Sequence, residues 1–357
     1  DRSNNANINF MQTIEDRRSY CTKLDISHSP LICAASEGHE HIVKLLLDRG
    51  ADIDLHQDYI PTALIGAAKN GHADIVKLLL DRGAQIDLQP IRIYTALTSA
   101  AQNGHINVVK LLLDGGADIN LQNGYPRYTA LMCAAYSNHI DVVRLLLARE
   151  ADINLNDYCD DTALTLAATK GNTDIVKLFL DQKNNVSFHL FMFRLFPRCG
   201  SNINYQGCFR YSPLIAASIN GHTSTVKLLL NRGANVNLMD QSYNTALIRA
   251  SEGGHSDIVK LLLDHRAYPN FQNIRKETAL MLDSEKGSVA SVESLLSHGA
   301  KPDFQDKQGK AALMWASYKG HAEIVELLLR YGANPNLKDK QGYTALSTVS
   351  VATRSAY

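Results

Sequence analysis

Apolar and polar positions follow one fixed order along most of the chain. Each unit starts with Thr, Ser or Ala, carries Leu two residues later, and continues with a small pair such as Ala67 and Ala68. A Gly-His step follows, then a broad apolar run such as Ile75 to Leu80, then a second glycine. Both apolar runs have helical spacing, and the glycines permit the left-handed backbone that ends a helix. The pattern predicts helix, turn, helix and a hairpin-like connection over 62–94.

This unit recurs through almost the whole sequence. Successive starts lie 33 or 34 residues apart, apart from one step of 50, and they are Ser29, Thr62, Thr95, Thr129, Thr162, Ser212, Thr245, Thr278, Ala311 and Thr344. A fixed period of this length predicts a stacked array in which each unit packs only on its neighbours. Function is therefore expected on an extended surface rather than in one central cleft.

Composition excludes several classes of protein. Lys and Arg together number 36, as do Asp and Glu, so no net charge favours nucleic acid. No apolar run approaches the roughly 18–20 residues that span a bilayer, and no signal peptide opens the chain. The six cysteines show no regular spacing, which suits reduced thiols. We expect a cytoplasmic monomer without membrane insertion and without a cofactor or metal.

Residues 310–342 carry the motif most fully, with Leu313, Ala316-Ser317, Gly320-His321 and Gly332-Ala333 in order. This series resembles the ankyrin repeat, and the resemblance covers about residues 29–346, as nine full repeats and the start of a tenth. Ala replaces the motif's Pro in most units. The resemblance implies an all-α ankyrin-repeat solenoid.

The period also divides the chain. The predicted parts are 1–28, the end of a preceding repeat with an extended loop; 29–181, repeats 1–5; 182–199, an irregular apolar insertion; 200–342, the end of repeat 5 and repeats 6–9; and 343–357, a partial repeat. The Phe-rich stretch 188–196 has two interpretations. It is either a partner-binding insertion or non-coding sequence translated in a faulty gene model.

Two polar columns are expected to belong to the structural frame. Helices pack roughly 8–10 Å apart, too far for histidines of neighbouring repeats to share a zinc ion at about 2.0–2.1 Å. We therefore predict that each His bonds the backbone of its own turn. Lysines such as Lys77, with Asp81 four residues later, predict ion pairs along one helix. The histidines are His39, His72, His105, His139, His222, His255 and His321.

The hairpin segments vary between repeats, so packing is not expected to dictate them. They hold nine of the fifteen tyrosines, and Tyr and Arg are favoured interface anchors. Tyrosines just before a first helix (Tyr94, Tyr128, Tyr211, Tyr343) are expected to pack structurally. The predicted anchors are Tyr59, Arg92, Tyr125, Arg127, Tyr158, Phe209, Arg210, Tyr243 and Arg275. The family resemblance also implies a concave groove lined by first-helix ends, which adds Tyr136 and Tyr318.

Three residues break the repeat pattern within the helices. Asp283 stands where other units have Ala, and a buried carboxyl without a partner would be costly. A hinge or a contact with Lys286 would explain it. Glu150 and Arg266 replace the glycine that ends a second helix, at about 1 kcal/mol each if the left-handed geometry persists.

No catalytic motif such as a phosphate-binding loop or a Gly-x-Ser-x-Gly elbow is present. The sequence therefore predicts a non-catalytic scaffold that binds other proteins, including cytoplasmic tails of membrane proteins, through the groove and hairpins. The alternative is the substrate-recognition arm of a larger multidomain enzyme or channel, of which this chain is a fragment lacking an initiator Met. The resemblance also implies that Asn120, Asn154 and Asn237 are substrates for asparaginyl hydroxylation.

Overall fold

The computed structural model describes residues 29–56, 60–91, 93–122, 124–182, 202–207 and 209–347. Within these ranges the chain forms paired helices, and strand pairing is limited to isolated bridges such as Met239 with Thr245. The predicted all-α solenoid is confirmed. The apolar segment 183–201 and the first loop lie outside the described residues, so the two interpretations of that segment stay open.

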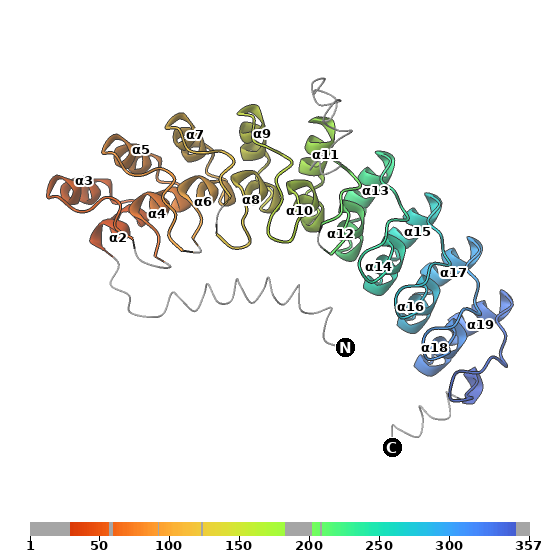
Figure 1. Ribbon diagram of the computed structural model, residues 1–357. Helices are drawn as coiled ribbons and strands as arrows, with labels where there is room; N and C mark the ends of the chain where they lie inside the picture. The colour runs from red at the N-terminus through yellow and green to blue at the C-terminus, as the bar shows by residue number, and fades with distance from the viewer. Residues whose placement is uncertain are drawn as a thin grey trace, which may run out of the picture.

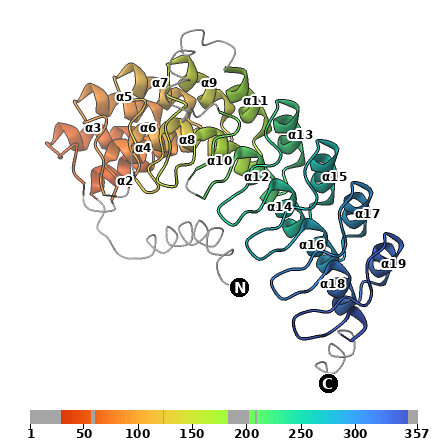
Figure 2. The same ribbon diagram turned by 45° about the vertical axis from the view of Figure 1, so that its right-hand side comes forward.

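Each repeat contributes one inner and one outer helix to an arc (Figure 1). The inner helices line the concave side and are α2 (Pro30–Ser36), α4 (Ala63–Asn70), α6 (Ala96–Gln102), α8 (Ala130–Tyr136), α10 (Ala163–Lys170), α12 (Pro213–Ile219), α14 (Ala246–Gly253), α16 (Ala279–Lys286) and α18 (Ala312–Lys319). The outer helices lie on the convex side and are α3 (Glu40–Asp48), α5 (Ala73–Asp81), α7 (Ile106–Asp114), α9 (Ile140–Ala148), α11 (Thr173–Gln182), α13 (Thr223–Asn231), α15 (Ser256–Asp264), α17 (Val289–Ser297) and α19 (Ala322–Arg330). Hairpin loops connect the repeats and extend from the inner helices toward the concave side (Figure 2).

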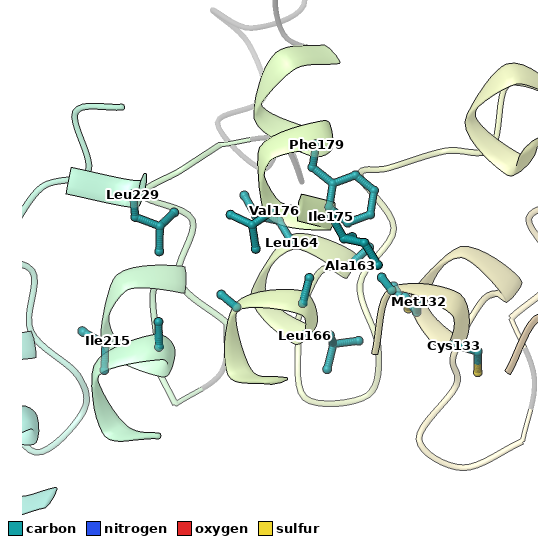
Figure 3. Packing of buried hydrophobic residues seen from close by; sticks show 14 of the residues in the cluster. Met132, Cys133, Ala163, Leu164, Leu166, Ile175, Val176, Phe179, Ile215 and Leu229 are labelled. Atoms are coloured by element: carbon teal, nitrogen blue, oxygen red, sulfur yellow. The ribbon is translucent and has the colours of Figure 1, made fainter. Parts of the chain in front are cut away.

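The core is a continuous layer between the inner and outer helices. Small residues such as Ala167 and Ala168 are fully buried and let successive inner helices approach closely. Larger side chains fill the space behind them, as Leu164, Val176 and Phe179 do around α10 and α11 (Figure 3). Burying each such side chain contributes roughly 1.5–3 kcal/mol.

Threonines cap the inner helices as predicted. Oγ1 of Thr62 accepts a hydrogen bond from the backbone N–H of Ile65 at 3.2 Å, and the same contact recurs at later starts. Ala311 has no such side chain, so α18 lacks the cap. Glu150 and Arg266 keep the left-handed backbone, with φ of 64° and 65°.

The histidine column is structural, but the predicted local partner is wrong. Nε2 of His105 lies 3.0 Å from the carbonyl oxygen of Lys69, in the last turn of the preceding inner helix. His72, His139, His222, His255 and His321 make the equivalent contact with Ser36, Gln102, Thr169, Ile219 and Glu285. Each imidazole therefore joins two repeats. The carbonyl of Lys69 can accept this bond because the last carbonyls of a helix have no partner within the helix.

The predicted Lys–Asp pairs along the outer helices are also wrong. Asp48 pairs with Arg82 of the next repeat at 2.9 Å, and Asp181 pairs with Arg232 at 2.7 Å. The lysines project from the helix face while the aspartates, at the helix end, are within reach of the neighbouring repeat. These pairs are solvent-exposed and contribute about 0–1 kcal/mol each.

Side chains within the hairpins hold the loops in register. Oδ1 of Asp240 accepts from the N–H groups of Ser242 at 2.7 Å and Asn244 at 3.0 Å. Asp157, Asn273, Asp306 and Asp339 repeat this arrangement. Adjacent hairpins also bond directly, as the N–H of Lys307 does to the carbonyl of Arg275 at 3.0 Å. Packing therefore dictates the polar base of each hairpin, and the expected freedom is confined to its tip.

Candidate partner-binding surface

Six successive hairpins expose a large apolar side chain at the tip. We call this set the hairpin-tip row; its members are between 39% and 65% exposed and are Ile91, Tyr125, Tyr158, Phe209, Tyr243 and Ile274. The next two hairpins carry Lys-Gln-Gly at the same place, over residues 307–309 and 340–342. The row therefore ends abruptly, although the backbone hydrogen bonds of the hairpins continue unchanged.

Two tyrosines in the middle of the row contact each other. The ring centroids of Tyr125 and Tyr158 lie 5.6 Å apart, and the hairpins that carry them are joined by the N–H of Tyr158 and the carbonyl of Pro126 at 2.8 Å. Tilted aromatic pairs at this distance stabilise each other while leaving outward faces available. The structure thus brings together two predicted anchors from separate hairpins.

Three predicted anchors occupy one strained backbone position. Arg127, Arg210 and Tyr243 have φ of 71°, 57° and 59°, and stand where later hairpins have Gly309 and Gly342. Left-handed geometry costs a residue other than glycine roughly 1 kcal/mol. These hairpins therefore retain large side chains at a site where glycine would be more stable.

The arginines at the hairpin tips differ in whether a carboxylate pairs with them. Arg127 donates to Oε1 of Gln122 at 3.2 Å, and neither it nor the exposed Arg210 forms an ion pair with a described carboxylate. Arg275 is instead held by Glu277 at 2.9 Å and approaches Glu252 at 4.0 Å. A partner that binds Arg275 would therefore have to compete with these two acids.

The concave groove holds one aromatic cluster on α8. Tyr136 is half-buried, its ring lies 6.2 Å from that of Tyr128, and Nζ of Lys170 lies 4.3 Å from its centroid. Tyr128 is buried, as predicted for a packing residue, and burial raises the pKa of its hydroxyl well above the usual value. Tyr343 was predicted to pack similarly but is 46% exposed. Tyr94, by contrast, packs against Gly124 of the next hairpin.

A second concave cluster on α18 includes a residue that the sequence analysis missed. Nε1 of Trp315 donates to Oδ2 of Asp306 at 3.2 Å, and Nζ of Lys310 lies 4.4 Å from the Trp315 ring. Lys310 also lies 5.6 Å from the ring of the exposed Tyr318. The signal was available, because Trp315 is the chain's one tryptophan and falls at an inner-helix position that varies between repeats.

Arg249, at the same helix position as Trp315, forms a buried ion-pair network that was not predicted. Its guanidinium lies 2.6 Å from Asp240 and 2.7 Å from Glu252. Burial alone would lower the pKa of Arg249, but Asp240, Tyr211 and Glu252 together raise it above its ordinary value. Removing either partner would leave a buried charge, so we assign this group a structural role.

The acidic hairpin beside Tyr158 is less charged than its composition suggests. Burial, with the nearby charges of Asp157 and Asp160, raises the pKa of Asp161 to about 8. Burial also raises the pKa of Asp157 to about 6. Over the described ranges, no cluster of three His, Cys, Asp or Glu residues could hold a metal ion. The predicted anchors Tyr59 and Arg92 lie outside those ranges.

The comparisons with known proteins agree with this architecture. A search of the helices in the described ranges finds none long and apolar enough to cross a membrane. No curated protein matches the sequence. A family model described as ankyrin repeats (three copies) matches residues 5–90, 31–123, 88–157, 184–273 and 265–339, and a single-repeat model matches 159–188. With matches over most of its length, the chain belongs to the ankyrin-repeat family.

Proposed function

We propose that this protein is a non-catalytic scaffold that holds partner proteins against its hairpin-tip row and concave face. Ankyrin repeats are in general modules for protein–protein interaction, which supports this class of function. The irregular cysteine spacing suits reduced thiols, and we propose the cytoplasm as the site of action.

One observation carries the proposal. The hairpin backbone is built the same way with aromatic tips and with Lys-Gln-Gly tips, so the frame does not require Tyr125, Tyr158 or Tyr243. Exposed aromatic side chains in a contiguous row, two of which meet at 5.6 Å, are typical of a surface that a partner covers. Strained backbone at Arg127, Arg210 and Tyr243 points to the same hairpins.

The geometry favours a partner that spans several repeats. Neighbouring repeats lie about one helix-packing distance apart, roughly 8–10 Å. A standard interface buries about 800 Å² on each partner, which a segment crossing four or five hairpins would supply. Tyr125 and Tyr158 would lie near the centre of such a contact, where truncation has its largest effect.

The test is affinity capture with matched variants. The tip variant carries Tyr125→Ser, Tyr158→Ser and Tyr243→Ser; the control variant carries Ile106→Ser, Leu329→Ser and Tyr331→Ser, which removes exposed apolar surface from the outer side. We expect the tip variant to lose partners that the wild type and the control retain, by tenfold or more in quantitative mass spectrometry. Equal capture by both variants, with unchanged thermal unfolding, would contradict the proposal.

A further inference from the structure

The junction between α14–α15 and α16–α17, which we call the 7/8 junction, lacks the side-chain contact that joins the other described repeats. That contact is made by a histidine or, in one repeat, by Asn172, whose Nδ2 donates to the carbonyl of Ala135 at 2.7 Å. Ser288 stands at the position that His255 and His321 of the histidine column occupy in the neighbouring repeats. A Cβ on Gly221 or Gly287 would meet the next imidazole at 2.7 Å, whereas one on Gly254 would meet only Cδ of Lys286 at 3.8 Å. At Gly254 the next repeat therefore offers no imidazole, and only the Lys286 side chain lies at van der Waals distance.

A buried carboxyl lies inside the same junction. Asp283 is fully buried on α16 at a position that is alanine in the other described repeats. The hydroxyls of Ser251, Ser291 and Ser288 face it and Lys286 is near, but neither carboxylate oxygen has a hydrogen-bond partner of normal geometry. Oγ of Ser284 is likewise unpartnered there, whereas the unpartnered Oγ of Ser251 has an equivalent in Ser218 of the preceding repeat. Unsatisfied buried polar groups weaken the interface that contains them.

The outer layer of the junction contains smaller side chains than its neighbours. Ser291 on α17 takes the place of the buried Ile258 and Ile324 in the neighbouring repeats. Its hydroxyl donates to Oγ of Ser256 at 2.8 Å. The small side chains let α15 and α17 pack closely, so the outer layer of this junction stays in contact.

The hairpin edge of the junction, by contrast, is fully bonded. The N–H of Ile274 donates to the carbonyl of Ser242 at 2.9 Å, and Nδ2 of Asn273 donates to Oδ1 of Asn244 at 3.1 Å. The N–H of Tyr268 donates to Oδ1 of Asn237 at 3.0 Å. The two repeats are therefore hydrogen-bonded along the hairpin edge, whereas the Gly254–Ser288 edge and the interior of the junction are weaker.

We infer that the 7/8 junction is a hinge: it opens at the Gly254–Ser288 edge and pivots on the hairpin edge. The motion carries α16–α19, with Trp315 and Tyr318, relative to the hairpin-tip row. A partner that contacts both surfaces would then meet an adjustable concave face rather than a fixed one.

Buried thiols placed at equivalent sites measure this opening. Ser251→Cys probes the 7/8 junction and Ser218→Cys probes the preceding one; both serines are completely buried. Alkylation of each engineered thiol in the intact native chain is followed with iodoacetamide and peptide mass spectrometry. We expect Ser251→Cys to react about tenfold faster, since a single missing inter-repeat hydrogen bond shifts an opening equilibrium by about that factor.

Two substitutions in the histidine column exchange the properties of the two junctions. Adding Ser288→His to Ser251→Cys should slow alkylation toward the rate of Ser218→Cys, because the space beside Gly254 admits the ring. Adding His255→Ser to Ser218→Cys should accelerate it by a similar factor, because His255 bonds Ile219 across that junction. Equal alkylation rates for Ser251→Cys and Ser218→Cys would overturn the inference. So would a faster rate for Ser251→Cys that Ser288→His does not slow and that His255→Ser does not reproduce in Ser218→Cys.

Discussion

Nε2 of His105 lies 3.0 Å from the carbonyl oxygen of Lys69, a residue 36 positions earlier in the chain. The contact crosses from one repeat to the previous one and recurs along the array. It explains why the histidines keep a fixed register without a role for a shared metal ion. It also separates the frame, which these contacts maintain, from the hairpin tips, which they leave unconstrained.

The first prediction concerns this hydrogen bond. We expect His105→Ala to lower the free energy of unfolding by about 1–2 kcal/mol, because the carbonyl of Lys69 loses its partner. Urea denaturation of the whole chain measures the effect. His41→Ala, on the exposed face of α3, is the control and should change stability by less than about 0.5 kcal/mol. Equal effects of the two substitutions would show that the inter-repeat contact contributes nothing.

The second prediction distinguishes two roles of glycine. Gly71 and Gly83 both have left-handed backbone, with φ of 81° and 86°, but only Gly71 lies against His105. A Cβ at Gly71 would approach Nδ1 of His105 to 2.6 Å, whereas a Cβ at Gly83 would meet nothing within 4 Å. We expect Gly83→Ala to cost about 1 kcal/mol and Gly71→Ala to cost about twice that. Thermal unfolding of the two variants should show this order, and the reverse order would refute the close approach.

The third prediction concerns strain at the hairpin tips. Tyr243 has a φ of 59° at a position that is glycine in later hairpins. We expect Tyr243→Gly to raise the free energy of unfolding by about 0.5–1 kcal/mol while it weakens partner binding. Tyr158→Gly should bring no such gain, because Tyr158 is not among the residues with positive φ. A loss of stability in Tyr243→Gly would mean that its ring packs within the frame.

The fourth prediction concerns pH and Asp283. Burial raises the pKa of this carboxyl from 3.8 to about 6. Between these values the folded protein binds a proton that the unfolded chain has lost, so stability falls as pH rises through this window and is constant above it. We expect Asp283→Asn to gain stability relative to the wild type from pH 4 to pH 7, by about 2–3 kcal/mol in total.

Chemical denaturation at a series of pH values checks the Asp283 prediction. Glu293→Gln, on the exposed face of α17, provides the control without a pH-dependent difference. A wild type whose stability relative to Asp283→Asn stays constant from pH 4 to pH 7 would show that the carboxyl is hydrated or paired in solution.

The period of the sequence predicted the helices, their threonine caps and the left-handed turns, because each depends on residues a few positions apart. It could not predict the partners of His105 or Asp48, since these lie one repeat away, whereas spacing along one helix points to local partners. Tyr125 and Tyr158 could be nominated as anchors from residue type, but their meeting at 5.6 Å depends on how the hairpins stack. The approach of Arg275 to Glu252 was not predicted for the same reason, because Glu252 belongs to another repeat.

The most direct test of the partner-binding surface is site-specific photo-crosslinking in cells. A photoreactive phenylalanine analogue replaces Tyr158 in the hairpin-tip row or, in a matched protein, the similarly aromatic and exposed Tyr331 at the end of α19. The account predicts discrete crosslinked partners from position 158 that are absent from position 331 and that disappear when Tyr125→Ser and Tyr243→Ser are added. Crosslinks from position 331 alone, or crosslinks from position 158 that survive those substitutions, would contradict it.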